Sequence, residues 1–306
     1  MTPLQNALNS YLTMRRSLGY KLTTQEQRLR GFVAFMSQRS AQTLTAKLAV
    51  EWAGSQCGPA TWSSRLSTVR SFARHAQMLD PRTEIPPSGM FPPQRRRRPY
   101  IYAPDEIDDL LRALPSLVPT PYQARTYCQF LALLATTGMR FSEGVNLTRA
   151  DVDFTAGLVT IREAKFAKTR IIPLHHTAIE ALKSYADIRD GVKARRDAPH
   201  FFAGFKGSFL RHDAIHKPFL TWARRAGIRG PGRWNGPCIH DLRHTFAVRT
   251  LIRWYEAGSD VERRLPLLST YLGHTHVRDT YWYLSATADL LRHASRRFEA
   301  RWEHAS

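Results

Sequence analysis

The sequence predicts a mainly α-helical protein with a small antiparallel β-sheet, divided into two domains. Apolar residues recur at helical spacing through most of the chain, whereas alternation of β-branched and polar residues is confined to residues 157–174. A stretch rich in proline and arginine interrupts both patterns. We therefore expect a helical domain over residues 1–84, a semi-extended linker over residues 85–100 and a second domain over residues 101–306.

The first domain is predicted to consist of short helices. Leu4, Leu8 and Leu12 lie at helical spacing, and Gly19 stands where a C-terminal cap is expected. Apolar residues at positions 29, 32, 33 and 36 indicate a second helix, and a third follows Pro59. The linker contains five prolines within residues 85–99, which exclude a continuous helix there.

The second domain opens at Pro104, where proline in the first turn and two following acidic residues favour a helix start. A helix over residues 121–137 is expected to end at Gly138. The stretch GLVTIREAKFAKTRIIPL (157–174) predicts a β-hairpin with a basic turn. Helical periodicity returns over residues 176–189, 208–226, 239–255, 262–272 and 286–302.

The charge of the chain is strongly positive. Lys and Arg number 45 against 25 Asp and Glu, a net charge of +20, which favours a polyanionic partner. Nucleic acid is preferred to an anionic membrane surface, since no lipidation or membrane-helix signal competes. No signal-peptide pattern is present either. The alternative explanation of the charge is that some soluble proteins are basic without binding a polyanion. The three cysteines lie far apart without CxxC spacing, which fits a reducing cytoplasm and argues against a zinc ribbon.

Four stretches of the second domain carry residues suited to phosphate chemistry, although each is weak when taken alone. Arginines after helix ends are common, basic hairpin turns are usually solvated, and surface histidines are usual. His240 with His244, and His212 with His216, have metal-ligand spacing but no evident third ligand, so we expect no metal. The stretches contain Arg140 after Gly138, the hairpin residues Lys165, Lys168 and Arg170, His240-x-x-Arg243 at a helix start, and Leu272-Gly273-His274 followed by Tyr283.

In this order, together with the IIPL strand after the hairpin, these stretches resemble the tyrosine recombinase (phage integrase) family. The resemblance covers nearly the whole chain. It implies that residues 1–84 are a helical, SAM-like core-binding domain and that residues 101–306 are a catalytic domain with a C-terminal tail helix. In the family the nucleophile follows the LGH histidine at the spacing of Tyr283. Tyr271 is then expected to pack, and Tyr281 to point elsewhere, because two helical positions differ by about 200°.

The resemblance also implies a role for each site residue. Tyr283 attacks a phosphodiester and forms a 3′-phosphotyrosyl link, with His240 as general base and Lys165 as general acid. Arg140 and Arg243 stabilise the non-bridging oxygens, and His274 bonds a phosphate oxygen or steadies the tyrosine. No metal or other cofactor is required. Lys168 competes for the acid role, although counting back from IIPL favours Lys165. Gly144 replaces the family's usual aliphatic residue, which puts local packing in doubt.

The predicted activity is that of a site-specific DNA recombinase or integrase. Its expected partners are double-stranded DNA with specific recombination sites, three further copies in a tetramer that passes through a Holliday junction, and a possible sister recombinase, in the bacterial cytoplasm at the nucleoid. The opening phrase YLTMRRSLGYKLTTQEQRL is similar to those of integrases of mobile elements. A type IB topoisomerase and a catalytically silent DNA-binding regulator are the alternatives. The residues expected to contact DNA are Arg65, Arg70, Arg74, Arg95, Arg96, Arg97, Arg98, Lys168 and Arg170.

Overall fold

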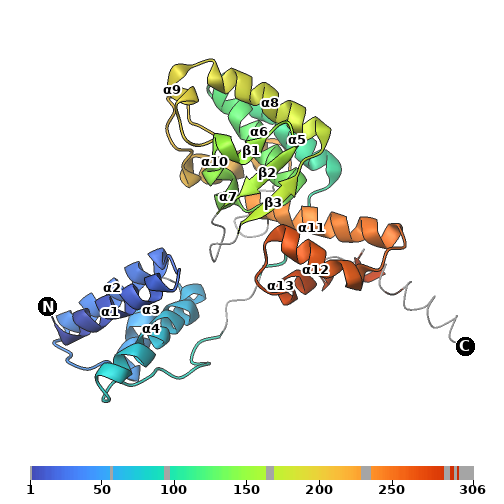
Figure 1. The fold of residues 1–306 in the computed structure, drawn as a ribbon. Helices are drawn as coiled ribbons and strands as arrows, with labels where there is room; N and C mark the ends of the chain where they lie inside the picture. The colour runs from blue at the N-terminus through green and yellow to red at the C-terminus, as the bar shows by residue number, and fades with distance from the viewer. Residues whose placement is uncertain are drawn as a thin grey trace, which may run out of the picture. The chain divides into compact units, whose positions relative to one another are not determined.

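The structure is a computed structural model that describes residues 2–55, 58–92, 97–162, 169–228, 236–285, 290–292 and 295. It divides into two compact units, Met1–Arg97 and Arg98–Ser306 (Figure 1). Both units are mainly helical, and the second contains a three-stranded antiparallel sheet, which confirms the predicted fold class. Within the described residues no helix is both long and apolar enough to span a membrane.

The first unit is a cluster of helices around an apolar core. Three predicted helices are confirmed. A fourth, over residues 46–55, was not expected, because it is only 10 residues long and several of its apolar residues are alanines. In the core the Phe32 and Trp52 rings meet edge to face, 5.3 Å apart. The helices are α1 (Pro3–Ser17), α2 (Thr23–Gln38), α3 (Ala46–Ser55) and α4 (Pro59–Leu79).

The arginines of α4 differ in their exposure. Arg65 is buried, donates to the Trp52 carbonyl at 2.8 Å and lies 3.9 Å from the centre of the Trp52 ring, so it joins α4 to α3. This placement contradicts the DNA contact expected of Arg65, because its guanidinium is enclosed by protein. Arg70 donates to the carbonyls of Pro86 and Pro87 at 2.7 and 2.6 Å, and thus holds the start of the linker against α4. Arg74 is exposed.

The second unit begins with a helical pair, continues through the small sheet and ends in further helices. Its longer elements agree with the predicted ranges, whereas the very short ones carry too few residues to show a period. The elements are α5 (Pro104–Leu117), α6 (Pro121–Thr137), α7 (Phe141–Asn146), η1 (Arg149–Asp151), β1 (Val152–Asp153), β2 (Leu158–Ile161), β3 (Arg170–Pro173), α8 (His176–Asp190), α9 (Lys193–Arg196), α10 (His212–Arg225), α11 (Ile239–Glu256), α12 (Val261–Leu272), α13 (Arg278–Tyr281) and η2 (Trp282–Ser285).

The sheet has the order β1-β2-β3 with antiparallel pairing throughout. The predicted hairpin is confirmed: β2 pairs with β3 so that Val159 faces Ile172 and Ile161 faces Arg170. The turn that carries Lys165 and Lys168 lies outside the described residues, as does most of the tail helix predicted over residues 286–302.

Two apolar clusters meet at α11, the helix that carries His240 and Arg243. Ile239 and Leu242 belong to the larger cluster, which α5, α6, the sheet, α8 and α10 also build. Later residues of α11 join α12 in a smaller cluster that includes Tyr283. Figure 1 shows α11 running between the main body of the unit and the pair α12–α13. Helix α11 is therefore held from both sides.

Candidate active site

Two helices end at the centre of the candidate site, each at a left-handed glycine. Helix α6 is capped by Gly138 at φ 62°, and α12 is capped by Gly273 at φ 69°, as the sequence predicted for both. The last carbonyls of a helix lack intrahelical partners and lie at the negative end of its dipole. Two such ends brought together therefore form a site that attracts cations.

Arg243 connects the two helix ends. Its Nη1 donates to the Gly138 carbonyl at 2.8 Å and its Nη2 to the Leu272 carbonyl at 2.7 Å. Only 3% of the residue is exposed. Burial lowers the pKa of Arg243 to about 10, against an opposing effect of Tyr283, so the guanidinium remains charged at neutral pH.

Arg140 and Arg170 reach the same region from other elements. Arg140, the N-cap of α7, donates from Nη2 to the Gly273 carbonyl at 2.8 Å and from Nη1 to Glu143 Oε1 at 2.8 Å. Arg170, at the start of β3, donates from Nε to the Tyr271 carbonyl at 2.8 Å. Both of its terminal nitrogens bond the two Glu143 oxygens, at 2.9 and 2.7 Å. Its side chain is only 10% exposed, so Arg170 lies within the cluster rather than on the open surface, and its contact with DNA stays a prediction.

Glu143 is the counterion that the sequence reading missed. Burial by itself raises the pKa of its carboxyl, but hydrogen bonds from Arg170 and the charge of Arg170, with further bonds from Arg140, lower that pKa to about 2. One carboxylate thus offsets one of the three guanidiniums, and the cluster keeps a net charge of two positive units. Such a partly enclosed positive cluster favours an anionic ligand such as a phosphate.

The glycines of the motifs allow these close approaches. A Cβ on Gly273 would lie 2.8 Å from Arg170 Nη1, and one on Gly138 would lie 2.5 Å from the Phe246 ring. Gly144, which departs from the family pattern, leaves room for Phe130, because a Cβ there would lie 2.9 Å from that ring. The departure is therefore accommodated by a larger side chain on the neighbouring helix α6.

Tyr283 is the tyrosine of the stretch 271–284 that faces this cluster. It is 3% exposed, and its ring lies 6.0 Å from that of His274 and 5.5 Å from that of His244. Tyr281 is 50% exposed. Tyr271 stacks on Phe246 at 5.5 Å, and burial raises its pKa to about 12, which confirms the packing role predicted for it.

His274 leaves the α12 cap towards Tyr283 and is held by a buried threonine. Its Nδ1 is hydrogen-bonded to Thr280 Oγ1 at 2.7 Å. Burial, followed by the charges of Arg243 and Arg140, lowers the pKa of His274 to about 4. The ring is therefore neutral at pH 7, and its hydrogen-bonding pattern is set by the threonine rather than by a positive charge.

His240 is exposed near the start of α11, and its ring lies perpendicular to that of His244 at 4.8 Å. The structure therefore brings Arg140, Arg243, His274 and Tyr283 together, with His240 connected to them through His244. Among the described residues no group of three or more potential ligands could hold a metal ion. Glu143 was open to detection, because an acid three residues after a helix N-cap is a capping-box signal.

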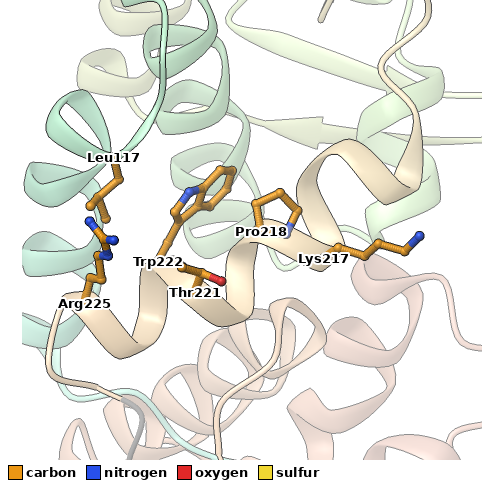
Figure 2. A pocket seen from close by; sticks show the side chains of 6 residues that line it. All are labelled: Leu117, Lys217, Pro218, Thr221, Trp222 and Arg225. Atoms are coloured by element: carbon orange, nitrogen blue, oxygen red, sulfur yellow. The ribbon is translucent and has the colours of Figure 1, made fainter.

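A separate pocket of about 450 Å³ lies between the end of α5 and the second half of α10 (Figure 2). Trp222 is one of the residues that line it, and its ring packs 5.2 Å from that of Tyr127. None of the predicted site residues described here lines it, so the pocket is distinct from the arginine cluster. The lining residues are Leu117, Lys217, Pro218, Thr221, Trp222 and Arg225.

Comparisons with known proteins agree with this arrangement. Residues 101–289 match the phage integrase family. The chain is 42% identical over 312 residues to an integrase/recombinase of Sinorhizobium fredii, y4rB, with 99% of each chain covered. It is 26% identical over 307 residues to the tyrosine recombinase XerC of Pelobacter propionicus, covering 95% of this chain and 94% of that protein. The structure of the Tn1549 transposon integrase with transposon right end DNA is similar, with a TM-score of 0.68 at 18% identity, covering 97% of this chain and 99% of that one.

The fold and the cationic site with its buried tyrosine define an enzyme that breaks and rejoins DNA strands. More particularly, the chain belongs to the phage integrase family, the tyrosine recombinases. The resemblance, the fold class and the class of activity predicted from the sequence are confirmed.

Proposed function

We propose that this chain is a site-specific recombinase that cuts and rejoins double-stranded DNA through a 3′-phosphotyrosyl intermediate on Tyr283. The observation that carries the assignment to Tyr283 is its burial beside His274, in electrostatic contact with Arg243 at the cationic cluster. A tyrosine hydroxyl has a pKa near 10, so its attack on phosphorus needs such assistance at neutral pH.

Arg140 and Arg243 are proposed to stabilise the charge that gathers on the non-bridging oxygens during attack. Each guanidinium carries five N–H donors, and the two carbonyl bonds of Arg243 occupy two of them. The carbonyls therefore orient the planar group while other donors face the phosphate. Because this orientation exists before DNA binds, little reorganisation is needed as the transition state forms.

His240 is proposed as the general base and Lys165 as the general acid that protonates the departing 5′-oxygen. Support for the lysine comes from the base of its hairpin. Arg170 is fixed at the site by Glu143 and the Tyr271 carbonyl, and Lys165 precedes it by five residues. The start of β3, which follows the turn in the sequence, is thus held at the cluster. Lys168 remains the competing candidate.

We further propose that the enzyme acts as a tetramer through a Holliday junction, on DNA that carries specific recombination sites, with or without a sister recombinase. A location in the bacterial cytoplasm at the nucleoid follows from this proposal. Exposure favours Arg74, Arg97 and Arg98 as phosphate contacts, and Arg70 only after it leaves the linker carbonyls. Arg95, Arg96 and Lys168 lie outside the described residues and stay predictions.

Two alternative functions, a type IB topoisomerase and a DNA-binding regulator without catalytic activity, differ from the proposal in what they require. A type IB topoisomerase uses similar chemistry as a monomer, and the separate N-terminal helical unit favours recombination instead. A regulator that has lost catalysis has no need to retain Arg140, His240, Arg243, His274 and Tyr283 together. Mobile-element integration is the biological setting that we favour, since the N-terminal phrase resembles those of such integrases.

A nicked suicide substrate tests the proposal, because loss of the short product strand traps the covalent complex. Wild-type protein should form an adduct of protein and DNA that resists denaturation, and Tyr283→Phe should bind the same DNA without forming one. Tyr281→Phe is the matched control and should cleave normally, as its ring is half exposed. An adduct formed by the Tyr283→Phe protein would rule out this nucleophile.

A further inference from the structure

Tyr102, near the start of the second unit, forms hydrogen bonds at several points along α11, the helix that carries His240 and Arg243. The Tyr102 N–H donates to Thr245 Oγ1 at 3.0 Å, and the Tyr102 hydroxyl donates to the Cys238 carbonyl at 3.1 Å. The Tyr102 carbonyl accepts a bond from Arg249 Nη2 at 2.8 Å. From Cys238 to Arg249 the helix rises by about 16 Å. A single buried residue therefore fixes α11 at three points.

The hydroxyl contact lies directly before the proposed catalytic positions. Cys238 is the N-cap of α11, and its N–H donates to the buried Asp241 carboxylate at 2.9 Å. The Cys238 carbonyl also accepts the Asp241 N–H at 3.0 Å. His240 lies within this turn, and Arg243 follows in the next. Tyr102 is 1% exposed, and burial raises the pKa of its hydroxyl, which therefore keeps its donor proton at neutral pH.

The residues around Tyr102 attach the same segment to other parts of the site. We call Tyr100–Ala103 the entry segment. The Tyr100 hydroxyl donates to Glu106, and Glu106 also accepts the Ala103 N–H at 2.8 Å, so the segment is tied to α5. Ile101 packs on the apolar cluster that contains Tyr283. The entry segment therefore contacts both α11, which carries His240, and the apolar cluster that contains Tyr283.

We propose that Tyr102 is a positioning residue for DNA cleavage, whose hydroxyl holds the first turn of α11 so that His240 and Arg243 face the phosphate. The inference rests on the proposed function, because it assumes those two roles. The second unit begins at Arg98, just before the entry segment.

The test is Tyr102→Phe, which removes one oxygen and keeps the ring. On the nicked substrate we expect adduct formation under single-turnover conditions to slow about 10-fold, since small misplacements of catalytic groups cost up to about 10²-fold. The affinity for DNA should change by less than about twofold. Sulfur at the 5′-bridging position should not restore the rate, because the variant impairs attack and charge stabilisation rather than departure of the leaving group.

Tyr122→Phe provides the matched control. Tyr122 is also buried, and its hydroxyl donates to the Ala203 carbonyl at 3.1 Å, the same kind of bond at the same distance. It lies at the start of α6, whereas the site lies at the other end of that 17-residue helix. We expect a comparable fall in Tm for the two variants, with the cleavage rate of Tyr122→Phe within about twofold of wild type.

A normal rate for Tyr102→Phe, or an equal loss of rate in Tyr122→Phe, would overturn the inference. Combining Tyr102→Phe with His240→Ala should slow cleavage by less than the product of the two single effects, because both act through one turn of α11. Fully multiplicative effects would also refute it. If wild-type protein forms no adduct at all, the proposed function itself fails, and that result is distinguishable from failure of the variant alone.

Discussion

The buried carboxylate of Glu143 provides the sharpest test of how the site is held together. The substitution Glu143→Gln keeps the shape of the side chain but removes the charge that Arg140 and Arg170 share. Only 5% of the Glu143 side chain is exposed, so water cannot replace the lost carboxylate oxygen charge. The two guanidiniums would then have only uncharged oxygen acceptors. Because removal of one partner from a buried ion pair leaves the other charge uncompensated, we expect the substitution to be strongly destabilising.

The magnitude follows from the pKa of Glu143. A fall from the ordinary 4.5 to about 2 corresponds to about 3 kcal/mol of folding free energy at neutral pH, at about 1.4 kcal/mol per pKa unit. Because the folded-state pKa is the lower one, this stabilisation is present above pH 4.5 and is lost as the pH falls towards 2. For a domain of about 200 residues, 1 kcal/mol changes Tm by about 2–4 °C. We therefore expect Glu143→Gln to lower Tm by about 6–12 °C at pH 7.

Differential scanning calorimetry of the full chain measures this change, since it can separate the transitions of the two units. Glu180→Gln is the matched control: it makes the same chemical change on the exposed face of α8 and should leave Tm within about 1 °C. The difference in Tm between wild type and Glu143→Gln should become smaller when the scans are repeated near pH 3. A gap that is as wide at pH 3 as at pH 7, or a variant as stable as wild type at pH 7, would refute the electrostatic reasoning.

Three further predictions concern the chemistry, the DNA contacts and the α12 cap. Lys165→Ala should slow cleavage of ordinary DNA by about 10²–10⁴-fold and recover on 5′-bridging phosphorothiolate DNA, as a thiolate leaves without protonation; recovery by Lys168→Ala alone would transfer the acid role to Lys168. Replacing Arg95 to Arg98 by Ala should reduce the slope of log affinity against log salt by about two to four, and an unchanged slope would mean that the run is solvated surface. Gly273→Ala should lower both Tm and the adduct rate, because its Cβ would lie 2.8 Å from Arg170 Nη1 at a φ of 69°; an unchanged adduct rate would contradict this.

The sequence predicted the regular elements well where a pattern of adequate length existed. The helix over residues 121–137 was predicted with its observed ends, because a proline begins it and a glycine ends it. The two-residue strand β1 and the four-residue helix α13 could not be predicted, since each spans only about one period of its pattern and a period must repeat to be recognised. Helix α3 was missed for a related reason, as alanines give a weak apolar signal.

The sequence could not predict which arginines are buried. Arg65, Arg74 and Arg170 all seemed suited to DNA in a chain of net charge +20, yet Arg65 and Arg170 are enclosed and Arg74 is exposed. The difference depends on partners far away in the chain. Arg170 meets Glu143 across 27 positions and the Tyr271 carbonyl across 101. Local composition contains no information about contacts at such separations.

The geometry explains why a glycine precedes a functional residue in two of the motifs, directly in one case and with one residue between them in the other. Gly138 ends α6 before Arg140, and Gly273 ends α12 before His274. In each case the left-handed turn exposes the last carbonyls of the helix, and guanidiniums from other elements bind them at 2.7–2.8 Å. A carbonyl bond holds an arginine without neutralising it, whereas a carboxylate partner removes a full charge. By using two helix ends and a single glutamate to orient three arginines, the site remains both ordered and positively charged, and these are the two conditions that binding and cleaving a phosphodiester require.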